Sequence, residues 1–264
     1  MIRKTFVQAK NFLTKSKLNQ GLTCNPYVGC EHGCVYCYAN YMVPGRTDYD
    51  SWGSYVDIRE YPNLDIPKNT GPKPLMFSSA CDAYQPLEAE TGSTRKIMEA
   101  IVESDLQIQI LTKSELVLRD IDLFKKMKMV EVGFSIALAD REASLFEPGA
   151  TPPSKRIAAL KELKAAGIPT YVFIAPIFPY LTEVIHLIDL LKDAVDYFMF
   201  DSFNLSHPLN RKRILGLIEK HYPKIYPEYV NIFNLKDRTF YNELKKNIMQ
   251  HAEALGVKVN YLYP

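Results

Sequence analysis

Short runs rich in β-branched and aromatic residues alternate along this chain with longer segments in which apolar residues recur every three or four positions. The short runs predict strands, and the periodic segments predict amphipathic helices. The expected strands are Leu22–Val28, Pro74–Ala80, Leu106–Thr112, Val130–Ala137, Thr170–Ile177 and Ala194–Phe203. The expected helices are Ser93–Glu103, Glu115–Met129, Ser154–Ala166, Thr182–Lys192 and Pro208–Tyr222. This alternation favours an α/β fold in which crossover helices join parallel strands.

The pattern continues to the end of the sequence without a linker that would divide it. A further helix is expected near Tyr241–Leu255 and a last strand near Val257–Tyr263. With 264 residues, of which 47% are hydrophobic, the chain is long enough to bury the core of one sizeable domain. We therefore expect a single domain over residues 1–264, with a core at about 20–205 and a C-terminal extension at about 206–264.

Composition favours neither a membrane segment nor a strongly charged partner. The longest apolar run, Tyr171–Leu181, contains Pro176 and Pro179 and is far shorter than the roughly 20 residues that a membrane helix needs. The formal net charge of +2 neither demands a nucleic-acid partner nor excludes one that meets a local basic patch. We expect a soluble protein without a membrane span.

Three cysteines in one short stretch supply the candidate chemistry. Cys30, Cys34 and Cys37 follow one another at C-x3-C-x2-C spacing. A cubic iron–sulfur cluster normally takes four thiolates, so three would leave one iron open to a substrate, which is a catalytic arrangement. A zinc site completed by His32 or by a distant residue is an alternative, although His32 lies between the ligands, where a closed tetrahedron would strain so short a loop.

Disulfide bonds are not expected. The chain has five cysteines, an odd number, and Met1 to Lys10 contain no apolar segment typical of a secretory signal. We therefore expect reduced thiols and a cytoplasmic protein.

The cysteine spacing, with Tyr36 just before the last cysteine, closely resembles that of the radical S-adenosylmethionine (SAM) superfamily. The resemblance implies a partial (β/α)6 TIM-type barrel with a C-terminal helical extension. It also implies a [4Fe–4S] cluster on the three cysteines, SAM bound at the open iron, and an electron donor of the flavodoxin or ferredoxin type. In that family SAM is cleaved to methionine and a 5′-deoxyadenosyl radical. The cysteines follow the first expected strand, at the end of the sheet where parallel α/β folds build active sites.

Further blocks of sequence look like the spore photoproduct lyase and its wider group of photolyase-like radical SAM proteins. These blocks are Asn25-Pro26-Tyr27, Cys37-Tyr38-Ala39, Phe77 to Cys81, Thr112-Lys113-Ser114, Glu147 to Pro152 with Arg156, and Ala175-Pro176-Ile177. The resemblance runs from about Asn25 to Pro179 and is weaker beyond it. It identifies a group that is not confined to one substrate.

Cys81 matches the position of a hydrogen-atom donor in the lyase. It lies 44 residues beyond Cys37, at the end of the second expected strand. A thiol suits this role because its S–H bond is weak, whereas the alternative is a free cysteine that packs as a small hydrophobe. The sequence Cys81-Asp82-Ala83-Tyr84 departs from the Cys-Thr-Ser-Asp pattern of the lyase, which puts the transfer of substrate in doubt.

Two tyrosines flank the last cysteine of the motif. The resemblance implies that Tyr36 packs beside the cluster and the SAM adenine, and that Tyr38 takes part in passing the radical between Cys81 and SAM. The alternative is that both rings only shield the cluster from water.

SAM also needs polar partners from the other strand ends. Lys113 and Ser135 match positions that contact SAM in the lyase, and a basic side chain suits the SAM carboxylate. Arg156 is a further candidate, with a solvated surface cation as the alternative. Ser79, Asp82 and Asp201 are expected at the same end of the sheet. In contrast, Cys24 is expected to be a core residue.

Two classes of function follow from these residues. The first is a radical SAM enzyme, and the second is a non-catalytic zinc-binding module that binds nucleic acid. For the enzyme, a lesion in DNA would need a basic groove and extrusion of the base. Basic residues near the C-terminus could serve, or form an ordinary solvated face: Arg211, Lys212, Arg213, Lys220 and Lys224. RNA, a peptide or a small molecule are alternative substrates.

Overall fold

Two sheets and a set of crossover helices make up the part of the chain that the structure, a computed structural model, describes. The described residues are 2–16, 21–41, 52–66, 70–204, 207–235 and 237–262. Within them, the larger sheet has the strand order β11-β10-β9-β8-β7-β6-β3-β2, and the smaller one has the order β1-β5-β4. The strands are β1 (Arg3–Gln8), β2 (Thr14–Lys15), β3 (Leu22–Cys24), β4 (Tyr27–Val28), β5 (Tyr55–Glu60), β6 (Pro74–Phe77), β7 (Gln107–Thr112), β8 (Val130–Ser135), β9 (Thr170–Ile177), β10 (Tyr197–Ser202) and β11 (Val259–Tyr261).

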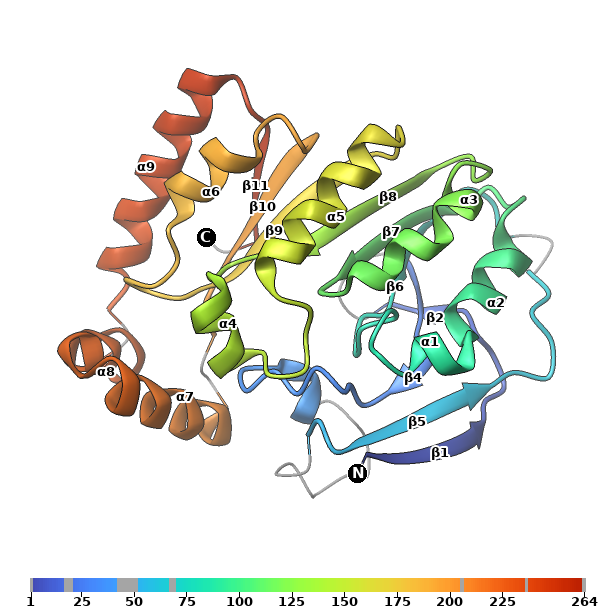
Figure 1. Cartoon of the computed structure of the whole chain (residues 1–264), viewed down its shortest axis with the longest axis horizontal. Coiled ribbons are helices and arrows are strands. Elements are labelled where there is room, and N and C mark those ends of the chain that lie inside the picture. The colour runs from blue at the N-terminus through green and yellow to red at the C-terminus, as the bar shows by residue number, and fades with distance from the viewer. Residues whose placement is uncertain are drawn as a thin grey trace.

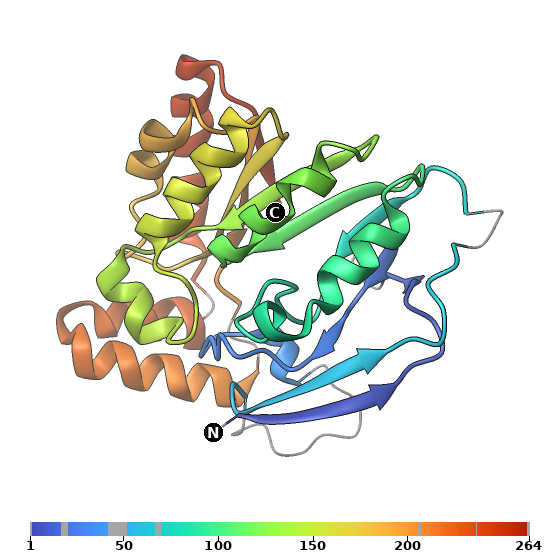
Figure 2. The ribbon, with the colours of Figure 1, turned by 45° about the vertical axis from the view of Figure 1, so that its right-hand side comes forward.

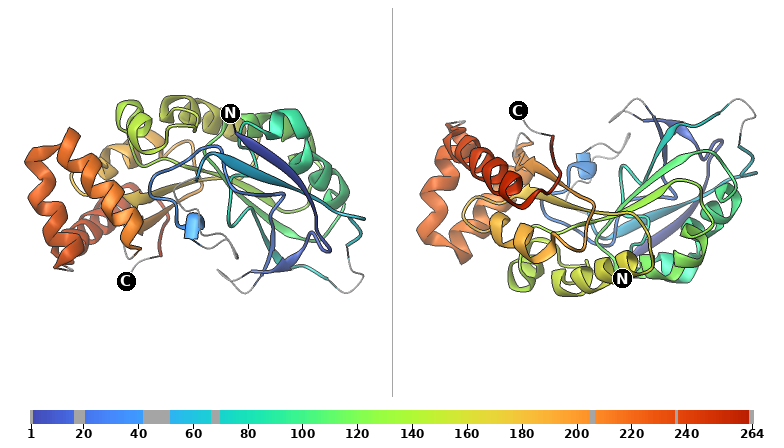
Figure 3. Two further views of the ribbon diagram at one scale, coloured as in Figure 1. Left: turned by 90° about the horizontal axis from the view of Figure 1, so that it is seen from below. Right: turned by 90° about the horizontal axis from the view of Figure 1, so that it is seen from above.

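Helices connect the strands and cover the larger sheet on one face. They are η1 (Tyr38–Tyr41), α1 (Glu88–Thr91), α2 (Ser93–Ile101), η3 (Glu115–Asp120), α3 (Ile121–Phe124), α4 (Asp140–Phe146), α5 (Pro153–Ala165), α6 (Val184–Leu191), α7 (Pro208–His221), η4 (Pro223–Ile225), α8 (Tyr226–Asn234) and α9 (Thr239–Leu255). Figure 1 shows α2, α3, α5, α6 and α9 along this face. Seen along the sheet in Figure 3, the helices form the outer arc and the cysteine segment lies on the opposite, inner side.

The parallel core of the larger sheet follows the order expected from the sequence. β3, β6, β7, β8, β9 and β10 are successive parallel neighbours. β11 adds a further parallel strand beside β10, and β2 pairs antiparallel with β3. The α/β class and the partial barrel are therefore confirmed. The C-terminal extension is therefore not only helical, because its strand β11 forms one edge of the larger sheet.

Helix boundaries follow local chemistry where the sequence carries a clear stop signal. α5 ends at Ala165, and Gly167 adopts a left-handed φ of 81°, a backbone conformation that glycine takes without steric cost. β9 then begins at Thr170, directly after Pro169. The apolar faces of these elements meet in one large core cluster, which includes the fully buried Cys24. The core position expected for Cys24 is confirmed.

Several elements differ from the expectation. The first expected strand, Leu22–Val28, was wrong as one strand, because it divides into β3 in the larger sheet and β4 in the smaller one. Asn25 and Pro26 separate the two, and proline has no N–H to give to a ladder. The expected helix Glu115–Met129 was also wrong in form, since it is a 3-10 segment followed by a short α-helix that ends at Phe124.

The sequence pattern did not predict β1, β2, β5, α4 or α8. All six residues of β1 are exposed, so this strand carries no alternation of buried and exposed positions that would reveal it. β1 pairs in parallel with β5, and β5 also pairs with β4. The smaller sheet thereby supports the segment that precedes the cysteines. No helix among the described residues combines the length and apolar character needed to span a bilayer.

The parallel strands end on the same side of the molecule and bring distant residues together. β6 leads into Ser78 to Cys81, β7 into Lys113, and β8 ends at Ser135. Figure 2 shows α7 at this same side, next to the cysteine segment. The Asn210 amide of α7 confirms the contact, because its Nδ2 donates to the carbonyl oxygens of Tyr36 at 3.3 Å and Cys37 at 3.2 Å.

Candidate active site

The cysteine loop, residues 29–37, is held on one side by the segment that leads into α1. The backbone N–H of Glu31 donates to the Gln85 side chain at 2.8 Å, and the Gln85 amide donates back to the Gly29 carbonyl at 3.3 Å. The Glu31 carboxylate accepts from the backbone N–H of Leu87. These reciprocal bonds satisfy loop groups that no strand partner reaches.

The opposite side of the cysteine loop is held by the segment that follows α4. The N–H of Val35 donates to the Phe146 carbonyl at 3.0 Å, and the N–H of Gly149 donates to the His32 carbonyl at 2.9 Å. A side chain at position 149 would not fit, because a Cβ atom there would lie 2.2 Å from the carbonyl oxygen of Glu31. The glycine therefore permits the close approach that fixes the loop.

The three motif thiols share one partly shielded space. Cys30 and Cys34 are buried, at 6% and 8% exposure, and Cys37 is half-buried. Burial raises the pKa of all three, that of Cys34 to about 12, while the positive charge of Lys113 works in the opposite direction on Cys34 and Cys37. The thiols are therefore protonated without a metal, and metal binding must release these protons.

The donor set fits a cubic cluster. Three soft sulfur donors come from one loop, they lie within electrostatic range of one another, and a cation lies beside them. Across the described ranges, no three His, Cys, Asp or Glu side chains converge as ligands of a single metal ion. The ligands of a cubane bind separate iron corners, so they need not converge on one point.

Tyr36 lies at the centre of the contacts behind the cysteine loop. Its ring packs edge-on against Phe178 and Phe203, with ring centroids 5.6 and 6.1 Å apart. Its hydroxyl donates to the Glu147 carboxylate. The Lys113 ammonium lies 5.8 Å from the ring centroid. Tyr36 thus lies between the cysteine loop, Glu147 and Lys113, and its expected place beside the cluster and the SAM adenine stays a prediction.

Lys113 and Ser135 lie at the ends of β7 and β8, as expected. Burial works to lower the pKa of Lys113, but the charge of Cys34, once its thiol ionises, and that of Glu147 outweigh it, so this pKa is raised and the ammonium stays charged. Ser135 is buried and its hydroxyl donates to the Ala175 carbonyl at 3.1 Å. A hydroxyl has two acceptor lone pairs, so Ser135 can still accept from a ligand.

Arg156 is not the solvated surface cation that the sequence left open. It is 1% exposed and lies inside the first turns of α5. Its guanidinium donates to the Thr151 carbonyl at 2.5 Å, the Ser135 carbonyl at 2.9 Å and the Glu147 carboxylate at 2.5 Å. The alternative of a surface cation was wrong, and Arg156 is instead part of the structure beneath the site.

Glu147 is a site residue to which the sequence pattern assigned no role. It is buried, and it accepts hydrogen bonds from both Tyr36 and Arg156. Burial works to raise its pKa, but Arg156, Lys113 and the Tyr36 hydroxyl outweigh it and hold the pKa below its usual value. The sequence offered one signal for Glu147: it begins the block from Glu147 to Pro152, which resembles the photolyase-like group. That resemblance assigned no role to the glutamate itself.

Asp82 lies beneath the cysteine loop and joins several elements. Its carboxylate accepts from the Thr112 hydroxyl at 2.8 Å, the Lys113 N–H at 2.7 Å and the Tyr84 N–H at 2.9 Å. His32 Nδ1 lies 3.4 Å from the same carboxylate, and burial lowers the pKa of His32. Asp82 therefore ties the strand ends to the cysteine loop, and its expected part in cofactor binding stays a prediction.

Ser79, Tyr38 and Cys81 form a second group on the β6 side. The Tyr38 hydroxyl donates to the Ser79 carbonyl at 2.6 Å, and the Ser79 hydroxyl accepts from Thr23 at 3.0 Å. The Cys81 thiol lies 3.5 Å from the Ser78 hydroxyl. Burial raises the pKa of Cys81 to about 12, so its S–H bond is intact at neutral pH. Cys81 also packs against the small core of Tyr27, Val56, Ile58 and Leu87, as a small hydrophobe would.

Asp201 lies near the end of β10 and is half-buried. Burial raises the pKa of its carboxyl group. The carboxyl end of β10 is on the same side of the sheet as the other strand ends, in agreement with the expected position.

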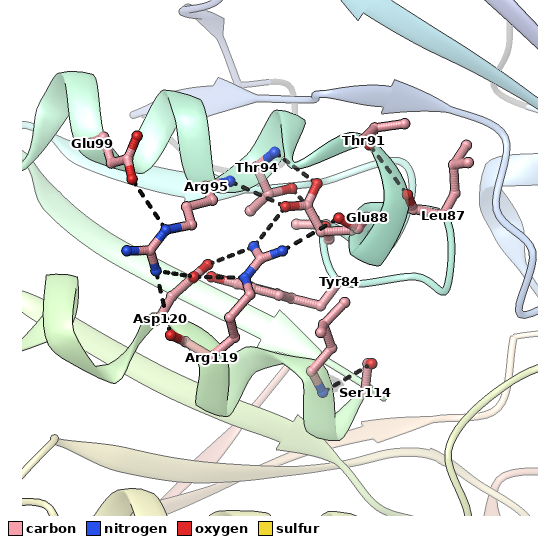
Figure 4. Close-up of polar contacts among 12 residues, drawn as sticks. Tyr84, Leu87, Glu88, Thr91, Thr94, Arg95, Glu99, Ser114, Arg119 and Asp120 are labelled. Atoms are coloured by element: carbon pink, nitrogen blue, oxygen red, sulfur yellow. Dashed lines mark hydrogen bonds and ion pairs between the residues drawn. The ribbon is translucent and has the colours of Figure 1, made fainter.

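A buried ionic network supports the segment that holds the cysteine loop (Figure 4). Glu88 is fully buried and accepts from the Thr94 N–H at 2.8 Å, the Arg95 N–H at 3.2 Å and the Arg119 guanidinium at 2.6 Å. The first two donors belong to the first turn of α2, where a carboxylate is stabilised by the helix dipole. Arg95 and Arg119 also pair with the buried Asp120. The network fixes α1, α2 and η3 to one another.

Replacing Glu88 with Leu should lower the free energy of unfolding by about 3 kcal/mol, because it removes the acceptor of buried helix N–H groups and the buried partner of the half-buried Arg119. Urea unfolding measures the change. The matched control is Glu90→Leu, which removes the exposed Lys4–Glu90 pair and should cost about 0.5 kcal/mol or less. Equal effects of the two replacements would contradict a supporting role for the network.

Comparison with known proteins agrees with this geometry. The model of the radical SAM superfamily matches residues 24–194. An uncharacterized protein of Methanocaldococcus jannaschii is 38% identical over 226 residues, which cover 83% of this chain and 84% of that protein. The spore photoproduct lyase of Bacillus subtilis is 29% identical over 213 residues, which cover 74% of this chain and 58% of the lyase. A solved spore photoproduct lyase complexed with dinucleoside spore photoproduct aligns over 98% of this chain and 82% of its own, with a TM-score of 0.66 and 19% identity.

The fold and the family match define an α/β enzyme built on a partial parallel barrel, with the cysteine loop at the carboxyl ends of its strands. The chain belongs to the radical SAM superfamily. Its similarity to the spore photoproduct lyase group, expected from the sequence, is confirmed. Membership of the superfamily implies a [4Fe–4S] cluster and SAM.

Proposed function

We propose that this protein is a radical SAM enzyme that holds one [4Fe–4S] cluster on Cys30, Cys34 and Cys37, cleaves SAM reductively, and repairs a thymine lesion in DNA as spore photoproduct lyase does. The observation that carries the proposal is the cysteine loop, held from both sides at the strand ends with Lys113 and Tyr36 beside it. A flavodoxin or ferredoxin would supply the electron, and reduced thiols agree with a cytoplasmic location.

Each residue of the site has a separate role in this proposal. When bound and reduced, the cluster supplies the electron that splits SAM into methionine and a 5′-deoxyadenosyl radical. Lys113 offers a half-buried positive charge for the SAM carboxylate, and Ser135 offers a hydroxyl acceptor. Tyr36 excludes water behind the cysteine loop. Cys81, with its intact S–H bond, would donate a hydrogen atom to the substrate radical, and the Tyr38 hydroxyl would return one to the sulfur. The Tyr38 radical would regain its hydrogen atom from 5′-deoxyadenosine, whose radical would rejoin methionine as SAM and give back the electron.

Helix α7 supports a nucleic-acid substrate. Its Asn210 is hydrogen-bonded to the cysteine loop, so the N-terminal end of α7, where Lys212 lies, is beside the site. Lys212 and Lys220 are exposed, while Ile214 and Ile218 face the core. Exposed cations beside a site suit contact with phosphates. This feature favours DNA over a neutral small molecule.

The proposal is tested with protein purified under anaerobic conditions. We expect a brown protein with four irons per chain that forms 5′-deoxyadenosine or turns over SAM when reduced. We expect it to convert an oligonucleotide that contains spore photoproduct to one with two thymines, and to leave the undamaged oligonucleotide unchanged. Cleavage of SAM without reaction on the lesion would remove the repair assignment and direct the search to RNA, peptides or small molecules. A colourless protein that holds zinc would refute the enzyme proposal itself.

Replacing Lys113 with Met should raise the KM for SAM about tenfold or more, because a charge-assisted hydrogen bond to a carboxylate is worth at least about 1.5 kcal/mol. Iron per chain should not change, since Lys113 is not a ligand. Steady-state SAM cleavage and an iron assay measure the two quantities. Lys113→Arg keeps the charge and should restore part of the affinity, and Ser135→Ala should have a smaller effect. An unchanged KM in Lys113→Met would remove this residue from the SAM site.

A further inference from the structure

A buried ion pair lies directly behind the proposed SAM site, where no step of the chemistry uses it. The side chains of Arg156 and Glu147 are 1% and 2% exposed, and Nη2 and Oε2 lie 2.5 Å apart. The other carboxylate oxygen of Glu147 accepts from the Tyr36 hydroxyl. The other guanidinium nitrogens bond carbonyls at the end of β8 and in the loop before α5. The pair therefore joins the cysteine loop to β8 and α5.

We propose that Glu147 and Arg156 are positioning residues that orient the Tyr36 ring and the Lys113 ammonium toward SAM without contacting SAM themselves. This inference deepens the proposed function and rests on it. It gives Arg156 an indirect part in SAM binding, where the sequence suggested a direct one, and it assigns Glu147 a task that the sequence did not suggest.

Energetics argue that the pair does more than stabilise the fold. Desolvation of two buried charges offsets most of their attraction, so a well-packed apolar pair of similar volume would be about as stable. An apolar pair would, however, make no directional hydrogen bonds to Tyr36 or to the backbone. Glu147 accepts along one line from Tyr36 and along another from Arg156, and this fixes the phenol oxygen in space.

The ring of Tyr36 is thereby fixed from both ends. Phe178 and Phe203 contact the ring edge-on, and Glu147 holds the hydroxyl. The backbone of Tyr36 is fixed in addition, because Asn210 donates to its carbonyl. An aromatic ring held in this way presents one face, and that face lies toward the Lys113 ammonium.

Lys113 depends on the same carboxylate through charge. Glu147 is among the groups that raise the pKa of this half-buried ammonium, whereas Arg156 works against it. The Lys113 backbone is tied to both neighbours of the site, since its N–H donates to Asp82 and its carbonyl accepts from Thr151. Thr151 in turn accepts from Arg156 through its carbonyl. Loss of the pair should therefore disturb both SAM-facing groups together.

Three variants test the inference. Tyr36→Phe removes only the oxygen that Glu147 holds. The double variant Glu147→Leu/Arg156→Met removes both charges and leaves no unpaired buried ion. The matched control is Glu115→Leu/Lys155→Met, which removes an exposed pair on η3 and α5 whose charged atoms lie 3.3 Å apart.

The expected result is a change in SAM binding at constant iron content. Tyr36→Phe and the double variant should hold as much iron per chain as the unaltered protein, with the KM for SAM raised about tenfold and kcat changed less than about threefold, since tenfold corresponds to the loss of about one hydrogen bond. The control should match the unaltered protein in all three. Adding SAM should shift the electron paramagnetic resonance spectrum of the reduced cluster. The two test variants should need a higher SAM concentration than the unaltered protein to reach the same shift.

Either of two results would overturn the inference. The first is a KM within twofold of the unaltered protein in both test variants. The second is loss of iron in Tyr36→Phe, which would show that the contact builds the cluster loop and does not orient SAM groups. If the double variant does not fold, Tyr36→Phe alone decides, because phenylalanine fits the half-buried position of the tyrosine ring.

Failure of the proposed function gives a different result. If the unaltered protein neither holds iron nor cleaves SAM, the proposed function fails without involving the pair. Hydrogen–deuterium exchange of residues 30–37 in the iron-free protein then remains as a readout. Faster exchange confined to Tyr36 and Cys37 in the double variant, with the rest of the loop as in the control, supports an orienting role; equal exchange, or faster exchange throughout the loop, overturns it.

Discussion

Replacement of Cys30, Cys34 or Cys37 with Ala is expected to abolish iron binding and SAM cleavage together. Each thiol would hold one iron corner, and a cubane with two protein ligands is exposed to loss of iron and oxidation. The fold should persist, because the cysteine loop is held by backbone bonds to Gln85, Phe146 and Gly149 that none of the thiols makes. Iron per chain, visible absorption and 5′-deoxyadenosine formation measure the outcome.

Cys24→Ala is the matched control for this prediction. Cys24 is a buried free cysteine of the core, only six residues before Cys30. Its replacement therefore also removes a buried thiol from this part of the chain, but not one of the three expected ligands. The control should lose some stability to a small cavity and keep its full iron content. If all three single variants of the motif kept the full iron content per chain and full activity, the assignment of these cysteines as cluster ligands would be wrong.

Replacement of Cys81 with Ala should leave iron content and SAM cleavage intact but divert the product. The S–H bond of Cys81 is intact at neutral pH because burial raises the pKa of the thiol to about 12. Without this thiol, the substrate radical has no protein hydrogen atom to accept. It should then be quenched by another donor, with SAM consumed and not regenerated. Product analysis by mass spectrometry with lesion-containing DNA measures the distribution.

Cys81→Ser separates donation from packing. Serine keeps the size and the contact with Ser78, but its O–H bond is much stronger than S–H, so it should fail as a donor in the same way as alanine. Because Cys81 also packs against the core around Tyr27, a packing role alone predicts a normal product profile in the serine variant. That profile would reduce Cys81 to a packing residue.

The sequence by itself determined the features that depend on local spacing. The C-x3-C-x2-C motif sets three thiols on one loop wherever that loop lies, so the spacing alone identifies the candidate cluster ligands. The alternation of strands and helices likewise predicts the six parallel strands in order, because each crossover unit carries its own periodicity and a stop signal such as Gly167. The expected strand ends then placed Lys113 and Ser135 on the cysteine side of the sheet.

Only the tertiary structure decided how distant residues meet. The split of Leu22–Val28 depends on pairing with β6 in one sheet and β5 in the other, which no local pattern encodes. The partners of Glu147 are Tyr36, 111 positions away, and Arg156, nine positions away, and a charged residue looks the same in sequence whether it is solvated or buried. Burial and pairing are properties of the assembled fold. For this reason the candidate ligands of the cluster could be identified from the chain, and the groups that orient the site around them could not.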